Sequence, residues 1–119
     1  MDWAHSLRAI RNKLQLRKRL GLPPWKPMCE ILAELERRKV NPADLNALEV
    51  FGYTGEMHVM DYAPIVSTLE AWEIEPRYAE QLTRNIPKAE VKVVDSYEEI
   101  RNTPRKYSFI VVDPPLRSL

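Results

Sequence analysis

Residues 47–55 read ALEVFGYTG, an apolar run that contains one acid and ends in a turn with two glycines. A short apolar run bounded by turn residues is typical of a buried strand, so we expect a strand over residues 47–51. Gly52 and Gly55 have no Cβ, which lets the turn bring its backbone close to a ligand. The carboxylate of Glu49 lies just before this turn. The stretch therefore predicts a strand that delivers a ligand-binding loop.

Three more apolar runs follow, and helical patterns separate them. The expected strands cover residues 69–74, 91–94 and 107–112, and the expected helices cover residues 76–86, which Pro76 opens, and 96–103, which the capping box Ser96-Tyr97-Glu98-Glu99 starts. The helix after the first strand should end near Tyr62, because Pro64 follows. Strands that alternate with helices predict right-handed crossovers. The expected fold class is α/β, with a Rossmann-like parallel sheet of about four strands.

The two parts of the chain differ in charge. Residues 1–40 contain ten basic and four acidic side chains, whereas residues 41–119 contain eight basic and thirteen acidic ones. The basic residues within 8–26 could neutralise the phosphates of a nucleic acid. They could equally form the solvated face of a helix that packs on the rest of the protein. The sequence favours packing but leaves nucleic acid as a possible partner.

Helical spacing of apolar residues accounts for most of this basic part. It predicts an amphipathic helix that includes residues 3–14, and a second helix that starts near Met28 and ends before Asn41. We therefore expect two N-terminal helices within a basic extension, residues 1–44. A Rossmann-like domain, residues 45–119, follows it.

Parallel α/β sheets bind ligands at the carboxyl ends of their strands. Each predicted strand of this chain ends in a polar or turn element, and the second ends in Glu73, whose carboxylate could accept hydrogen bonds from paired ribose hydroxyls. The candidate cofactor-binding residues are Glu49, Phe51, Gly52, Tyr53, Gly55, Glu73, Ile74, Asp95 and Ser96, and the fourth strand ends in Asp113-Pro114-Pro115. A nucleoside could lie across these four strand ends.

In this order and spacing, the motifs resemble those of the class I S-adenosylmethionine-dependent methyltransferases, over roughly residues 45–116. The resemblance implies S-adenosylmethionine as the cofactor. It implies that Glu49 and the glycine loop hold the methionine part, that Glu73 binds the ribose and that Asp95 binds the adenine. The form of the loop is most similar to that of some ribosomal RNA methyltransferases.

Asp113 and Pro114 are the catalytic residues that the resemblance implies. The expected chemistry is in-line displacement at the methyl carbon of the sulfonium, to which the protein contributes chiefly alignment. The Asp113 carboxylate and the Pro114 carbonyl would accept hydrogens from an amine nucleophile. Leu116 stands where methyltransferases of exocyclic base amines usually have an aromatic residue, which weakens the case for base amines. The acceptor stays open between a nucleic acid and a small molecule.

The family fold normally has seven strands, whereas this sequence supplies about four. With the strand order 3-2-1-4, the fourth strand would lie at an edge and present an unpaired ladder. We expect the N-terminal, cofactor-binding half of a truncated methyltransferase, or an oligomer or partner that covers this strand. The alternative function is a non-catalytic binding or assembly module that keeps the fold. A dinucleotide oxidoreductase fragment is least favoured, because Gly-x-Gly-x-x-Gly is missing.

The remaining reactive side chains predict no further chemistry. His5 and His58 are far apart in the sequence and are interpreted as ordinary polar residues, so no metal site is expected. Cys29, the single cysteine, is expected to be a buried packing residue of the second helix rather than a nucleophile. One cysteine, no secretory leader pattern and no apolar run near the roughly 18 residues of a membrane span predict a cytoplasmic protein that does not enter the membrane.

Overall fold

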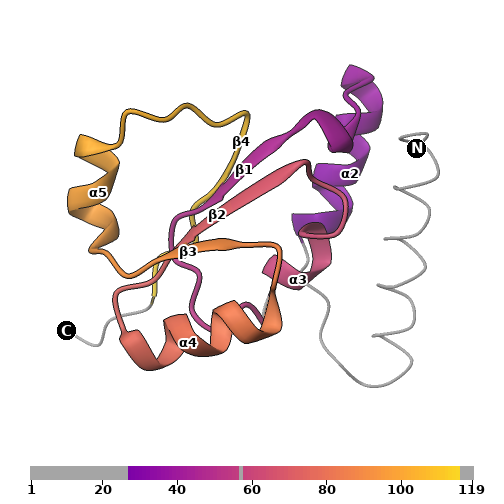
Figure 1. Ribbon diagram of the computed structural model, residues 1–119. Coiled ribbons are helices and arrows are strands. Elements are labelled where there is room, and N and C mark those ends of the chain that lie inside the picture. Colours follow the sequence, from indigo (N-terminus) through magenta and orange to yellow (C-terminus); the bar gives the residue numbers. More distant parts are fainter. Residues whose placement is uncertain (1–26, 57, 116–119) are drawn as a thin grey trace.

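The computed structural model describes residues 27–56 and 58–115. Their strands form one parallel sheet with the order β3-β2-β1-β4, as Figure 1 shows. The strands are β1 (Asn46–Glu49), β2 (Thr68–Trp72), β3 (Glu90–Lys92) and β4 (Phe109–Val111). The predicted α/β class, the parallel pairing and the strand order are thereby confirmed. β1 lies in the interior of the sheet, between β2 and β4.

Helices connect the strands in the alternation that the sequence predicts. The helical segments are α2 (Pro27–Arg38), the 3-10 turn η1 (Pro42–Asp44), α3 (Val59–Tyr62), α4 (Pro76–Asn85) and α5 (Ser96–Asn102). Pro76 opens α4, and α3 ends at Tyr62 as expected. The first predicted N-terminal helix lies outside the described residues. Within them, no helix is long and apolar enough to cross a bilayer.

The observed strands end one or two residues earlier than the predicted ones. β1 ends at Glu49 and β2 at Trp72, although the apolar pattern of the sequence continues beyond both. After β1 the pattern continues because Val50 and Phe51 also pack in the protein, whereas Ile74, two residues after β2, is 61% exposed. Val50, Phe51 and Val94 pack with Leu48 and Trp72 in a small cluster on one face of the sheet. The apolar pattern therefore predicted burial correctly after β1 but not at Ile74, Val93 and Val112, and it overestimated the length of the strands.

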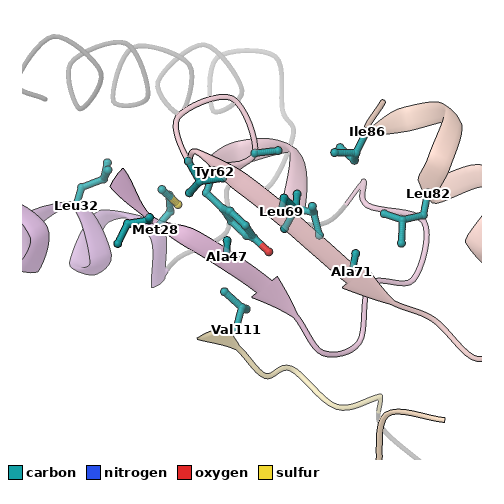
Figure 2. Packing of buried hydrophobic residues seen from close by; sticks show 13 residues of the cluster. Met28, Leu32, Ala47, Tyr62, Leu69, Ala71, Leu82, Ile86 and Val111 are labelled. Carbon is teal, nitrogen blue, oxygen red and sulfur yellow. The ribbon is translucent and has the colours of Figure 1, made fainter. Parts of the chain in front are cut away.

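The main core lies on the other face of the sheet. Side chains of a strand alternate between the two faces, and Ala47, Leu69, Ala71 and Val111 all point to this one. Met28 and Leu32 of α2, Tyr62 of α3 and Leu82 and Ile86 at α4 pack against them (Figure 2). The ring of Tyr62 also meets the ring of Phe109 edge-on, with centroids 5.3 Å apart. This core fixes three helices on one side of the sheet.

Helix α2 belongs to this core although it falls within the predicted N-terminal extension. Met28 and Leu32 are fully buried, in the same cluster as residues of the sheet. The boundary at residue 44 itself stays a prediction, but α2 is packed on the domain that follows it.

The predicted burial of Cys29 is wrong, because its side chain is exposed. Met28 and Leu32 lie about one helical turn apart and share the buried face of α2. Cys29 lies about 100° around the helix from Met28, and this rotation turns it to solvent. The apolar character of a single residue does not decide which face of a helix it occupies.

Glu70 of β2 points to the face opposite the main core and ties the chain before β4 to the sheet. Its Oε2 accepts hydrogen bonds from Trp72 Nε1 at 2.7 Å and from the Tyr107 hydroxyl at 2.6 Å. Its Oε1 accepts one from Arg105 Nη1 at 2.6 Å and lies 3.5 Å from Lys92 Nζ. Burial by itself would raise the pKa of Glu70, but these hydrogen bonds and positive charges outweigh it and lower the pKa.

Replacement of Leu32 tests whether α2 is part of the domain core. Leu32→Ala should lower the free energy of unfolding by about 2–5 kcal/mol, because it removes a fully buried side chain and leaves a cavity. Urea unfolding followed by circular dichroism measures the change. Ala33→Gln, on the exposed face of the same helix, should stay within about 0.5 kcal/mol of the wild type. An equally small effect of Leu32→Ala would contradict the packing of α2 on the sheet.

Replacement of Glu70 tests the hydrogen bonds on the face of the sheet opposite the main core. Glu70→Gln should lower the free energy of unfolding by about 1–3 kcal/mol near neutral pH, since the buried carboxylate loses its charge-assisted hydrogen bonds. The pKa of Glu70 is lower in the folded protein than its ordinary value of 4.5, so its contribution is present above that pH and is lost as the pH falls below it. Urea unfolding at about pH 7 and about pH 3 should show the difference from wild type shrinking. Glu98→Gln, at an exposed position of α5, is the control. If the difference in the free energy of unfolding between Glu70→Gln and the wild type does not depend on pH, the ionic role of Glu70 is contradicted.

Candidate functional site

The loops that follow the four strands enclose one cavity of about 570 Å³. Nine of the eleven candidate site residues from the sequence line it, and Glu49 and Gly55 do not. The lining comprises Phe51, Gly52, Tyr53, His58, Val59, Trp72, Glu73, Ile74, Glu75, Tyr78, Asp95, Ser96, Tyr97, Asp113, Pro114 and Pro115. The structure thus brings residues from all four strand ends into one cavity.

The glycine turn after β1 is closed tightly against β2 and α4. The Gly52 amide donates to the Trp72 carbonyl at 2.7 Å, and the Gly55 amide donates to the Gly52 carbonyl at 3.0 Å. Gly55 has φ +80°, and a Cβ on it would lie 2.8 Å from a methyl carbon of Leu82. Both the backbone conformation and the contact with α4 therefore require glycine at this position. Gly55 packs against α4 and does not line the cavity, whereas Gly52 forms part of the cavity wall.

Glu73 is held at the cavity by two backbone amides. Its Oε1 accepts a hydrogen bond from the Tyr53 amide, and its Oε2 accepts one from the Glu75 amide, both at 2.8 Å. Tyr53 itself is in the left-handed region with φ 50°, and its ring packs on that of Tyr78 with centroids 4.5 Å apart. A carboxylate has about four lone-pair sites, so two remain for a ligand. The carboxylate is therefore fixed in place and still able to accept hydrogen bonds from neighbouring hydroxyls.

The start of α5 supplies Asp95 and Ser96 to the cavity, in roles that differ from the predicted capping box. Asp95, not Ser96, is the N-cap, and its Oδ1 accepts a hydrogen bond from the Tyr97 amide at 2.9 Å. The buried Ser96 hydroxyl donates instead to the carbonyl of Val50. Ser96 therefore joins α5 to the end of β1, and its hydroxyl could bind a ligand only as an acceptor.

The segment after β4 also lines the cavity, through Asp113, Pro114 and Pro115. Glu73 follows β2, so it and this segment lie on either side of β1 in the order of the strands. The Asp113 side chain is 61% exposed. Pro114 and Pro115 have no amide N–H, so neither of them supplies a backbone donor that competes for the Asp113 carboxylate or the Pro114 carbonyl. A carboxylate and a carbonyl are thus available there to a ligand with N–H or O–H groups.

His58 is the residue that sequence reasoning misinterpreted. The structure buries it, with 5% exposure, between Glu49 and Asp113. Its Nε2 contacts Glu49 Oε1, and its Nδ1 lies 3.8 Å from Asp113 Oδ2. The Tyr62 hydroxyl also donates to Glu49 Oε1, at 3.1 Å. The available signal was its position three residues after Gly55, at the ligand-binding end of β1.

The burial of this cluster changes the pKa values of its members. Burial raises the pKa of Glu49, although the hydrogen bonds from His58 and Tyr62 oppose the rise. For His58, burial would lower the pKa, but the hydrogen bond and charge of Glu49, with the charge of Asp113, outweigh it and raise the pKa. Burial and the neighbouring Glu49 also raise the pKa of Tyr62. Glu49 and His58 are thus in direct contact, and the titration of each depends on the charge of the other.

The charged groups that line the cavity are mostly acidic. They include four carboxylates and His58, and no Lys or Arg lies among the described residues of the wall; the acids are Glu73, Glu75, Asp95 and Asp113. Aromatic rings cover much of the rest, from Phe51, Tyr53, Trp72, Tyr78 and Tyr97. Carboxylates attract cations and repel phosphates, and aromatic faces also favour cations. In the described part of the chain, no group of His, Cys, Asp and Glu is arranged to bind a metal ion.

No protein-family model matches this sequence. No curated protein matches it either. The chain is similar in structure to the crystal structure of Thermoplasma acidophilum 1320, with a TM-score of 0.55 and 19% sequence identity. The similarity covers 72% of this chain and 46% of the other, so this chain spans less than half the length of that protein. At this identity the comparison shows the fold alone, an α/β parallel sheet of Rossmann-like type.

Proposed function

We propose that the chain binds S-adenosylmethionine and is the cofactor-binding part of a methyltransferase. The observation that carries the proposal is the Glu73 carboxylate, which two backbone amides hold at a cavity shared by all four strand ends. A carboxylate in this position suits the paired hydroxyls of a ribose. The cavity volume of about 570 Å³ lies within the usual range of small-molecule sites.

The residues of the cavity fit the parts of this cofactor. Glu73 would bind the ribose, and the exposed side chain of Ile74 with the nearby Asp95 would contact the adenine. The turn at Gly52 would hold the methionine part, because Gly52 and Tyr53 line the cavity directly after β1. The acidic and aromatic wall suits the positive sulfonium and ammonium groups. When bound, the cofactor supplies an activated methyl group to a nucleophile.

Asp113 and Pro114 are the residues we assign to the methyl acceptor. Both line the same cavity as Glu73, at the end of β4. The carboxylate and the carbonyl accept hydrogen bonds from an N–H or O–H group of the acceptor and so orient it. Such alignment is the main contribution that a protein makes to an in-line displacement.

The charge of the wall argues against a dinucleotide as the ligand. The pyrophosphate of a nicotinamide cofactor would meet four carboxylates and no Lys or Arg in the described wall. Like charges at such short range are unfavourable. This observation supports a sulfonium cofactor over a dinucleotide as the ligand.

A binding or assembly module is the second candidate function, and β4 favours it. β4 lies at the edge of the described sheet, where Ile110 and Val112 are 52% and 57% exposed. An exposed apolar edge strand is prone to pair with another chain. A module of this kind would associate through β4 and would not need the cofactor.

Calorimetric titration tests the proposal. The wild type should bind S-adenosylmethionine and its demethylated product and should not bind a nicotinamide dinucleotide. Glu73→Gln should weaken binding at least about tenfold, because a charge-assisted hydrogen bond to the ribose is lost. Glu80→Gln, exposed on α4, should bind as the wild type does. Circular dichroism checks that Glu73→Gln is folded.

Two results would reject the proposal. One is a folded wild type that does not bind either sulfur compound; if light scattering also shows an oligomer, the assembly module is favoured. The other is equal affinity of the wild type and Glu73→Gln, which would remove the observation on which the proposal rests.

A further inference from the structure

His58 is placed so that each of its ring nitrogens faces a different carboxylate. Nε2 contacts Oε1 of Glu49, on β1, and Nδ1 lies 3.8 Å from Oδ2 of Asp113, after β4. His58 is buried and also lines the cavity. It therefore connects the interior of the sheet with the segment that we assign to the methyl acceptor.

The two contacts favour the protonated form of the imidazole. A neutral imidazole has one N–H and one lone pair, so it would direct a lone pair at one of the two carboxylates. Only the imidazolium has an N–H on both nitrogens. Glu49 is fully buried, and its Oε2 accepts no hydrogen bond from residues 27–56 or 58–115. A positive charge at His58 offsets the cost of this buried carboxylate.

We propose that His58 is a positioning residue, whose imidazolium bridges Glu49 and Asp113 and holds the Asp113 carboxylate, ionised, at the cavity wall. The distance of 3.8 Å to Asp113 is that of an ion pair and is too long for a hydrogen bond. Asp113 therefore keeps its hydrogen-bonding capacity for a ligand. Its use in orienting an acceptor N–H or O–H rests on the proposed function, whereas the bridge itself does not.

The surroundings of His58 contain several acids. Glu49 faces it from β1, Asp61 and Tyr62 from α3, and Asp113 from the end of β4. All three carboxylates favour the protonated imidazole. Loss of the proton at high pH would leave these acids without their shared cation. The Asp113 carboxylate would then lose its ion pair with His58.

Nuclear magnetic resonance of the ligand-free protein tests the bridge. The chain has two histidines, so the imidazole signals of 15N-labelled protein can be assigned with a His5→Gln variant. We expect the titration midpoint of His58 to lie above 6.5, the ordinary value of a histidine. Asp113→Asn should shift this midpoint downwards, because it removes one of the bridged charges.

A matched control separates the bridge from the general acidity of the cavity. Asp95 lines the same cavity, and asparagine would preserve its role as the N-cap of α5. Asp95→Asn should therefore leave the His58 titration unchanged and α5 intact. Glu49→Gln should shift the midpoint further downwards than Asp113→Asn does, but this variant is used only if it folds.

Stability provides a second measurement. The pKa of His58 is raised in the folded protein, so its contribution is full below 6.5 and is lost as the pH rises through the folded pKa. The melting temperature of His58→Gln should fall furthest below wild type under acidic conditions, and the gap should narrow as the pH rises.

The proposal is overturned if His58 titrates at or below 6.5, or if Asp113→Asn leaves its midpoint unchanged. It is also overturned if the gap in melting temperature does not depend on pH. None of these measurements uses a cofactor. A confirmed bridge in a protein that does not bind S-adenosylmethionine would reject only the proposed function.

Discussion

β1 lies between β2 and β4 and pairs in parallel with both, and the rest of the site depends on this pairing. Ala47 is in register with Leu69 on one side and with Phe109 on the other. Parallel pairing aligns the carboxyl ends of the three strands, so the loops that follow them leave the sheet together. Glycines, acids and prolines that are far apart in the sequence thereby line one cavity. The alternation of side chains places the main core on one face of the same sheet.

The chemistry of the cavity follows from which side chains these loops carry. The described wall contains carboxylates and aromatic rings, and its single basic group is His58. That composition favours a ligand with positive charge and with hydroxyls, and it disfavours one with phosphates. The fold itself accommodates many nucleoside ligands, so the fold alone does not choose among them. The choice that we propose among them rests on the charge of the wall and on the position of Glu73.

His58 shows why part of the site was not predictable. Its significance depends on Glu49, which lies nine positions before it, and on Asp113, which lies 55 positions after it. A lone histidine in a sequence is usually an ordinary polar residue, and no pattern of spacing marks this one. Glu49 was expected to hold the cofactor directly, yet it is buried behind His58 and is not part of the cavity wall. Both roles arise from burial, which removes water from the two side chains and makes each the partner of the other.

The sequence by itself determined the fold class and the strand ends at which the cavity lies, because apolar runs, glycines and prolines act through local rules of backbone geometry and burial. The strand order 3-2-1-4 was expected only from the resemblance to a family, since local rules do not fix which strands become neighbours. Those rules also located nine of the eleven residues at the wall. Only the tertiary structure decided that Cys29 faces solvent, that Asp95 caps α5, and that Ser96 donates to Val50. It likewise joined His58 to Glu49 and Asp113. These outcomes depend on which atoms meet once distant segments pack, and pair contacts of that kind leave no periodic trace in the order of the residues.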